Sequence, residues 1–348
     1  MATPLEPRSF ANQILPAFTG AWRDCLKRNL NRQSLLIAIT VATAAPLAWA
    51  QAYPGKPITL VVPYPAGASV DRIGRALAVE LGKRLRSSVV VENVGGASGT
   101  LGAKKVQRAP ADGYTLLLGS VNDLIVGPAA LKSGYSIRNF TPIAKLSTNS
   151  TVLVAHTGLA ASNVDELTAM VARAKEPLLI GATGVAMIQT IGGTLIADAA
   201  GFKVSPVVYK GGAPLLNDLM GGQVQVGTMA LTGALPMIRA GKLKALGIIS
   251  ARRDPTAPEI PTVNESKTVK GAEADLWTGL FGPANLPAPV VARLAAAMRE
   301  VLADPTYQAG EFKAGSIASE PGDPKAFQEY LQREESRLSP LLANLKVE

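Results

Sequence analysis

Three loops of small residues carry the groups that could do chemistry in this chain. They span residues 63–71, 93–100 and 181–184, and each follows a short apolar run that predicts a strand. Small residues let successive backbone N–H groups approach one ligand oxygen, and the amino end of a helix adds about half a positive charge. Together the loops predict a site for an anionic group. An ordinary glycine-containing turn is the alternative for each loop taken alone.

The sequence offers few groups for catalysis. It has one histidine, His156, and one cysteine, Cys25, which excludes a disulfide framework, a cysteine-rich zinc site and an iron–sulfur cluster. Neither a G-x-S-x-G elbow nor a GxxxxGK[ST] phosphate loop is present. We interpret His156 as a polar hinge residue rather than a base, and Lys210 as a cleft or packing lysine rather than a Schiff-base lysine. A binding protein without a cofactor is therefore expected, not an enzyme.

Residues 1–50 have the pattern of an export signal. Basic residues up to Arg32 precede the apolar segment 35–48, which ends in the small-x-small sequence Ala48-Trp49-Ala50. The segment is shorter than the about 20 apolar residues of a membrane-spanning helix. We expect a signal peptide over 1–50, cleaved near Ala50, with an amino-terminal membrane anchor as the alternative.

The charge does not indicate nucleic-acid binding. The chain has 35 basic and 26 acidic residues, and residues 1–50 hold five and two of these, so the exported part has 30 and 24, a net charge of +6. These charges are not clustered, and aromatic residues make up only 5% of the chain. Binding to a nucleic acid requires clustered basic residues together with stacking aromatics.

Apolar runs and helical periodicity alternate along the rest of the chain. The predicted strands are 58–62, 88–91, 114–118, 151–155, 178–180, 204–208, 224–229 and 243–249. The predicted helices are 71–85, 100–108, 163–174, 188–200, 215–220, 235–240, 287–302 and 324–342. This alternation indicates an α/β protein of two lobes, each a mainly parallel sheet flanked by helices. Ligands of such sheets bind at the carboxyl ends of the strands, here in the crevice between the lobes.

Nine short stretches occur in an order typical of one family. They are Tyr53-Pro-Gly-Lys-Pro-Ile58, Val62-Pro-Tyr-Pro-Ala-Gly67, Val89-Val-Val-Glu-Asn93, Asp112-Gly-Tyr-Thr-Leu116, Tyr209-Lys-Gly211, Gly221-Gly-Gln-Val224, Ala240-Gly-Lys-Leu-Lys-Ala-Leu246, Glu259-Ile-Pro-Thr-Val263 and Trp277-Thr-Gly-Leu-Phe281. From about Tyr53 to the carboxyl terminus the chain resembles the TctC-like extracytoplasmic solute receptors, or Bug proteins, of tripartite tricarboxylate transporters.

The resemblance implies a two-lobe periplasmic-binding-protein fold of the type II kind. Lobe 1 is expected over 51–152 plus 277–348 and lobe 2 over 153–276, with a hinge near 152–156 and 272–280. The implied function is periplasmic capture of a small mono- or dicarboxylic or aromatic acid by a monomer that delivers it to membrane subunits of a transporter. A sensor that presents the acid to a membrane kinase is the alternative, and a secreted hydrolase is less favoured.

The resemblance also assigns a binding site. One wall comprises Tyr64, Ala66, Gly67, Ala68, Ser69 and Asp71, with Ser120 and Asn122 beside it. The opposite wall comprises Thr183, Gly184, Val185, Tyr209, Lys210 and Gly211, with Met229 and Ala230 behind. Trp277 and Phe281 are interpreted as packing residues rather than as stacking partners of the ligand.

The sequence departs from the family pattern at several positions. Ala68 replaces the second glycine of the first loop, and Gln225 stands where an aspartate is usual. In the third loop, Ala186 and Met187 replace Gly-Ser, and Thr190 occupies the usual histidine position. These changes predict a more apolar far wall, which would favour a monocarboxylate or aromatic acid over a tricarboxylate.

Overall fold

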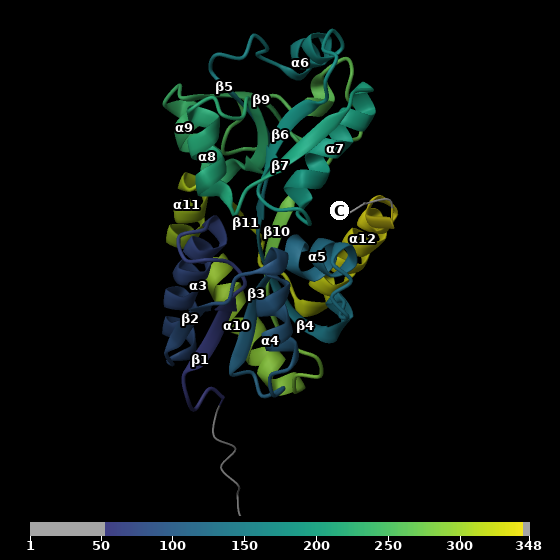
Figure 1. Ribbon diagram of the computed structural model, residues 1–348. Coiled ribbons are helices and arrows are strands. Elements are labelled where there is room, and N and C mark those ends of the chain that lie inside the picture. The colour runs from purple at the N-terminus through teal and green to yellow at the C-terminus, as the bar shows by residue number, and fades with distance from the viewer. Residues whose placement is uncertain (1–52, 344–348) are drawn as a thin grey trace, which may run out of the picture. The chain divides into compact units, whose positions relative to one another are not determined.

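The computed structural model of the protein describes residues 53–343, which form two β-sheets with helices on their faces (Figure 1). The six-stranded sheet has the order β11-β4-β10-β3-β1-β2, and the five-stranded sheet has the order β7-β6-β8-β5-β9. The predicted signal peptide and its cleavage point lie outside the described residues. No helix within 53–343 is long and apolar enough to cross a membrane.

Strands and helices alternate over most of the chain. The strands are β1 (Ile58–Val62), β2 (Val89–Asn93), β3 (Thr115–Ser120), β4 (Phe140–Asn149), β5 (Thr151–His156), β6 (Leu178–Ala182), β7 (Val204–Val208), β8 (Val226–Ala230), β9 (Leu243–Ile248), β10 (Leu276–Pro283) and β11 (Ile317–Ala318). The helices are α3 (Ser69–Leu85), α4 (Thr100–Gln107), α5 (Gly127–Ala130), α6 (Val164–Val171), α7 (Ile188–Ala200), α8 (Gly212–Met220), α9 (Leu231–Arg239), α10 (Ala288–Leu302), α11 (Pro305–Lys313) and α12 (Pro324–Ala343). Single turns are η1 (Ala97–Gly99), the π-helical η2 (Asn122–Val126), η3 (Ile137–Asn139) and η4 (Val263–Glu265).

The six-stranded sheet is buried on both faces, which explains why β1 and β3 are continuous apolar runs. Side chains alternate between the faces along a strand. Leu60 and Val62 of β1 therefore join the cluster that contains α3 and α10, whereas Val61 between them joins the cluster that contains α4 and α12. The five-stranded sheet follows the same rule, with Val152 facing α8 and α9 and Leu153 facing the cluster that contains α6 and α7.

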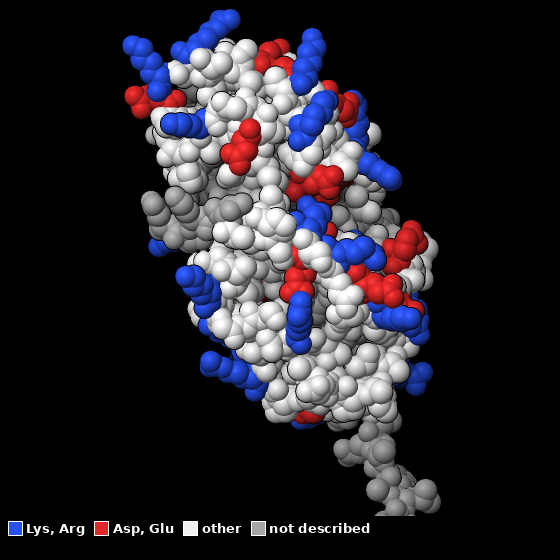
Figure 2. Space-filling view, turned by 90° about the vertical axis from the view of Figure 1, so that its right-hand side faces the viewer, with Lys and Arg blue, Asp and Glu red and all other residues white. Residues whose placement is uncertain are grey.

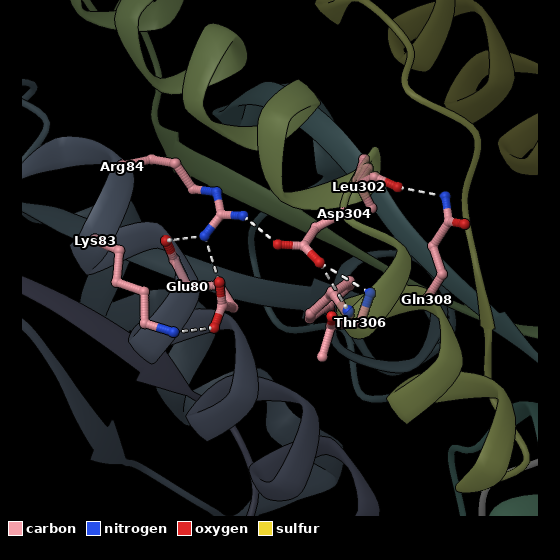
Figure 3. A network of polar contacts seen from close by, with 8 residues as sticks. Glu80, Lys83, Arg84, Leu302, Asp304, Thr306 and Gln308 are labelled. Atoms are coloured by element: carbon pink, nitrogen blue, oxygen red, sulfur yellow. Dashed lines mark hydrogen bonds and ion pairs between the residues drawn. The ribbon is translucent and has the colours of Figure 1, made fainter.

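The helices on one face of the six-stranded sheet are also joined by polar contacts (Figure 3). Asp304 accepts hydrogen bonds from the backbone N–H groups of Thr306 and Tyr307 at 2.9 and 3.4 Å, and so caps α11. Arg84, at the end of α3, donates to the same carboxylate at 2.6 Å and also pairs with Glu80. This network ties α3 to the junction of α10 and α11, and so holds the helix that the first loop opens.

The chain passes between the sheets twice. It leaves β4 at Asn149 and enters β5 at Thr151, and it returns through residues 249–275 into β10. The hinge expected at 152–156 thus lies inside β5, just after the first crossing. The two crossing segments are tied together, because Thr151 Oγ1 donates to the carbonyl of Ala274 at 2.5 Å and Ser150 Oγ donates to Asp254 at 2.7 Å.

The predicted α/β alternation is confirmed, and most strands of each sheet run in one direction, although both sheets also contain antiparallel pairs. Strands β1, β2 and β3 are parallel, whereas β10 runs antiparallel to both β3 and β4. In the second sheet β6 is parallel to β7 and β8, but β5 is antiparallel to β8 and β9. The antiparallel strands are those next to the crossings, where the chain must enter one sheet and return from the other.

Candidate functional site

The carboxyl ends of the parallel strands of both sheets lie at the edges where the chain crosses. In the first sheet, Ser120 at the end of β3 pairs with Thr278, close to the start of β10, and Leu276 pairs with Asn149 at the crossing. In the second sheet, Ala230 at the end of β8 pairs with Thr151. The loops after β1, β2 and β3 therefore emerge next to the crossings, as do those after β6, β7 and β8.

Asp71 fixes the shape of the first loop. The residue is only 4% exposed. Its side chain accepts hydrogen bonds from Gly67 N–H and Asn93 Nδ2, both at 2.9 Å, and from Arg75 Nε at 3.0 Å. Burial alone would raise the pKa of Asp71, but the hydrogen bonds from Gly67, Arg75 and Asn93 outweigh it and lower the pKa below its ordinary value. Gly67 has φ of +84°, a conformation that favours glycine. Asp71 thus acts on the loop and presents no free oxygen.

The open donors of this loop lie at the start of α3. The N–H of Gly67 is bonded to Asp71, and that of Ala68 donates to the carbonyl of Pro65 at 3.2 Å. The N–H groups of Ser69 and Val70 belong to the first helical turn, where no intrahelical acceptor exists. The N-cap residue Ala68 offers no side-chain acceptor. A ligand oxygen at this end of α3 would meet unpaired donors and the positive end of a 17-residue helix.

Tyr64 and Ser120 meet beneath this loop over a buried acid. Their hydroxyl oxygens are 3.0 Å apart, and both groups contact Asp123, from the Tyr64 hydroxyl at 3.1 Å and from Ser120 Oγ at 2.5 Å. Burial raises the pKa of Asp123 to about 7, against the opposing hydrogen bonds from Ser120 and Tyr64. Sequence reasoning did not select Asp123. Its position three residues after Ser120 was the available signal, but its burial depends on the convergence of distant loops.

Asn122, which follows β3 of the six-stranded sheet, contacts the start of α7, a helix that packs on the five-stranded sheet. Its Oδ1 accepts the N–H of Ile188, the first residue of α7, at 2.7 Å, and its Nδ2 donates to Gln189 Oε1 at 3.3 Å. Asn122 and Gln189 are 2% and 4% exposed. Asn122 therefore supplies to α7 the acceptor that the helix's own N-cap residue, Met187, does not provide. Asn122 therefore has partners on α7, and its expected contact with a ligand stays a prediction.

The predicted residues of the second wall follow β6 and β7. Thr183 and Gly184 continue from β6, and Thr190 Oγ1 donates to the carbonyl of Gly184 at 2.5 Å, which fixes this loop. Tyr209 follows β7, and its hydroxyl donates to Asp218 at 2.9 Å. Thr190, at the family's histidine position, thus has a structural partner within the chain.

The other predicted second-wall residues differ in exposure. Val185 and Lys210 are exposed, Gly211 and Ala230 are half-buried, and Met229 is buried under α8 and α9. In the first wall, Ala66 is exposed and Ser69 is half-buried. Gln225 lies just before β8, at the edge away from the crossings and away from the predicted site residues.

The residues that could have indicated catalysis lie elsewhere. His156 ends β5 at the edge opposite the crossings, and its Nδ1 accepts the N–H of Gly158 at 3.2 Å. Trp277 and Phe281 pack against Phe327 with ring centroids 6.3 and 5.2 Å away. Within residues 53–343, no group of three or more His, Cys, Asp or Glu side chains could hold a metal ion.

On the face seen in Figure 2, basic and acidic side chains are interspersed, so no large patch there carries charge of one sign. Hollows of about 480 and 530 Å³ lie on α12 and beside the start of β6. Neither is lined by a predicted site residue. At the predicted site the two sides contact each other through Asn122 and the start of α7.

The comparisons with known proteins identify the family and the fold. The model of the tripartite tricarboxylate transporter family receptor, TctC, matches residues 73–346. BugT of Bordetella pertussis is 31% identical over 280 residues, which is 79% of this chain and 85% of BugT. The structure of the periplasmic binding protein BugD is 32% identical, with a TM-score of 0.76 over 85% of this chain and 99% of BugD.

Two similar structures contain a dicarboxylate. MatC of Rhodopseudomonas palustris with bound malate is 29% identical, with a TM-score of 0.77 over 83% of this chain and 100% of MatC. A second R. palustris protein, with adipate, is 26% identical, with a TM-score of 0.76 over 83% of this chain and 97% of its own. The fold is thus that of the two-sheet α/β periplasmic binding proteins, and this chain belongs to the TctC, or Bug, family of solute-binding receptors, a family of transport receptors and not of enzymes.

Proposed function

We propose that the protein is an exported receptor that holds a small organic acid between the two crossing edges, which are the edges of the two sheets where the chain passes from one sheet to the other. Cleavage near Ala50 releases a monomer into the periplasm. Its lobes are residues 51–152 plus 277–348 and residues 153–276, and they close around the acid and present it to the membrane subunits of a tripartite transporter.

One observation carries this proposal: five helices begin at the crossing edges without a side-chain cap from their own N-cap residue, and for one of them, α7, the side chain of Asn122 supplies an acceptor instead. These are α3, α4, α7, α8 and α9, whose N-cap residues are Ala68, Gly99, Met187, Gly211 and Ala230. Among the helices that begin elsewhere, α6 and α11 are capped by Asn163 and Asp304, whereas α10 begins after Pro287 without a side-chain cap. Helix starts at these edges supply positive potential and N–H donors, which suit a carboxylate. The first N–H groups of α7 and α9 are bonded to Asn122 and to the carbonyl of Ser150, so the open donors lie mainly on the other helices.

The lining favours an acid with an apolar part. Met187 is 9% exposed and packs under Gly184, since a Cβ at Gly184 would lie 2.8 Å from Met187 Cγ. Val185, 39% exposed, is the large apolar side chain on that loop. We infer that a monocarboxylate, a linear dicarboxylate or an aromatic acid fits better than a tricarboxylate, and the malate and adipate in related proteins support a small acid.

Calorimetric titration of residues 51–348 with citrate, malate, adipate and benzoate tests this function. We expect saturable binding of at least one of the last three acids and weak binding of citrate. Tight binding of citrate alone would contradict the proposed selectivity. Absence of binding to every acid of the panel would contradict the receptor function itself. Mass spectrometry of the exported protein checks the amino terminus after Ala50 and identifies any acid that co-purifies.

A further inference from the structure

Asp123 is a buried acid that the proposed binding function does not by itself require. It is 0% exposed. Its Oδ1 accepts hydrogen bonds from Ser120 N–H at 3.0 Å, Ser120 Oγ at 2.5 Å and the Tyr64 hydroxyl at 3.1 Å. Within residues 53–343 no lysine, arginine or histidine pairs with it; its neighbours are neutral donors. A buried carboxylate without a cation is expensive to keep ionised.

Three loops of the proposed first wall converge on this carboxyl group. Tyr64 comes from the loop after β1, Ser120 ends β3, and Gly99 belongs to the loop after β2. A Cβ at Gly99 would lie 2.8 Å from Asp123 Cβ and 3.2 Å from the Tyr64 hydroxyl oxygen. On the proposed function, an acid bound above these loops would lie next to Asp123.

The titratable groups that face Asp123 are two tyrosines. Tyr64 donates to its carboxylate, and the Tyr135 hydroxyl donates to its backbone carbonyl at 2.5 Å. Burial raises the pKa of both tyrosines, and the charge of Asp123 adds to the rise. Both remain neutral at physiological pH, so the charge of this cluster changes only through Asp123.

On the basis of the proposed function, we propose that Asp123 couples capture of the acid to the uptake of one proton. In the ionised state, both hydroxyl hydrogens of Tyr64 and Ser120 point to Asp123 Oδ1, and a ligand carboxylate above them meets a like charge in a water-poor environment. When a solvent proton binds to the Asp123 carboxylate, its new O–H donates to one of these hydroxyl oxygens. The hydroxyl so engaged no longer needs to donate to Asp123, and its hydrogen can turn toward the ligand. The receptor thus binds one acid anion and one proton together.

The proton also sets the direction of the pH effect. Above pH 7 Asp123 is ionised in the free receptor, and the bound anion raises the pKa of Asp123 further. Affinity for the acid therefore falls as the pH rises above 7, by at most tenfold for each pH unit when one proton is taken up.

The substitution Asp123→Asn tests the coupling. The amide oxygen can still accept from Ser120 and Tyr64, but the side chain carries no charge and cannot titrate. Asp218→Asn is the matched control, because Asp218 accepts from Tyr209 on the opposite wall as Asp123 accepts from Tyr64.

The first measurement needs no ligand. Thermal unfolding is followed from pH 5.5 to pH 8.5 for the wild type and both variants. We expect a loss of wild-type stability on raising the pH toward 7 that Asp123→Asn removes and Asp218→Asn retains. Identical pH profiles of the wild type and Asp123→Asn would overturn the titration of Asp123, whatever the ligand.

The second measurement is calorimetry with malate, adipate and benzoate at pH 6 and pH 8.5 in two buffers of different ionisation enthalpy. For the wild type we expect tenfold or greater loss of affinity at the higher pH and uptake of up to one proton. Asp123→Asn should bind equally at both pH values and take up none. Wild-type binding without proton uptake at pH 8.5 overturns the coupling alone. Failure of all three acids to bind overturns the receptor function, and the coupling with it.

Discussion

Replacement of Asn122 by alanine tests whether this side chain holds the two sides of the site together. Its Oδ1 is 2.7 Å from the N–H of Ile188, and its Nδ2 is 3.3 Å from Gln189 Oε1. Alanine removes both contacts. While the two walls are in contact, as they are in this structure and as we call the closed arrangement, the substitution leaves the N–H of Ile188 without an acceptor. Ile188 is 0% exposed.

The magnitude follows from the difference between the closed and open arrangements. A buried N–H without a partner costs about 1–3 kcal/mol. When the walls separate, water can bond to the same N–H, so the penalty applies only to the closed form. Taking about 2 kcal/mol, Asn122→Ala should lower the ratio of closed to open molecules by about 30-fold. Gln189→Leu removes only the longer contact and should change the ratio by a few-fold at most.

Distances between spin labels report this ratio. The only cysteine of the chain is Cys25, so a chain of residues 51–348 carries no competing thiol. Cysteines introduced at Val90 on β2 and Leu179 on β6, which are 53% and 54% exposed, place one label on each sheet. We expect one narrow distance distribution without ligand in the wild type and in Gln189→Leu. In Asn122→Ala a longer, broader distribution should appear.

The result that refutes this reasoning is a distribution in Asn122→Ala that equals the wild-type distribution. If the same variant also lost affinity for an acid that the wild type binds, Asn122 would act on the ligand directly, as the sequence predicted. Thermal unfolding of both variants separates a change in closure from a loss of folding.

Three further predictions concern single side chains. Asp71→Asn should weaken acid binding about tenfold in calorimetry, because the neutral amide binds Gly67 N–H and Arg75 less strongly, by about 1–2 kcal/mol; unchanged affinity would exclude this role of Asp71. Burial raises the pKa of Asp275 to about 6, so the folded state binds a proton on this carboxylate more tightly than the unfolded state does. The free energy of unfolding should therefore fall by up to about 3 kcal/mol as the pH rises from about 4 to 6. Chemical denaturation across that range should show a slope that Asp275→Asn removes, and an equal slope in the variant would contradict the prediction. Gly279→Ala should destabilise the fold by about 1–3 kcal/mol, since its Cβ would lie 2.4 Å from Phe327 Cζ, whereas Gly310→Ala, with no atom within 4 Å, should not.

Elements whose patterns are local were predictable from the sequence. The strand Ile58–Val62, a continuous apolar run, and the helix up to Leu85, with apolar residues at helical spacing, are found close to their expected bounds. Strand β4 was not predicted, because Pro142 and Lys145 interrupt its apolar pattern. In the sheet, β4 pairs with β10 on one side and with β11 on the other. Both partners lie more than 100 residues away from it in the sequence. Long-range pairing of this kind leaves no local signal.

The site was predictable only in outline for a related reason. A glycine-containing loop after a strand indicates where donors can gather, and the resemblance to a family indicated which loops to choose. Which N–H groups remain open depends on the partners that folding supplies. Gly67 N–H is bonded to Asp71, and Ile188 N–H is bonded to Asn122 across the site. Asp123 becomes important only because three loops meet above it.

The uncapped helix starts and the contact of Asn122 have one physical explanation. A missing N-cap costs about 0.5–2 kcal/mol of helix stability, so helices that begin at the crossing edges are less stable than they could be. An oxygen acceptor on the opposite side recovers part of this free energy, and Asn122 Oδ1 does so for α7 at 2.7 Å. A ligand carboxylate is a stronger acceptor for the same kind of group, because its hydrogen bonds are charge-assisted. On the proposed function, the two walls therefore close weakly on the chain's own side chain and more firmly on an acid, and the difference between the two acceptors is the free energy available for recognition.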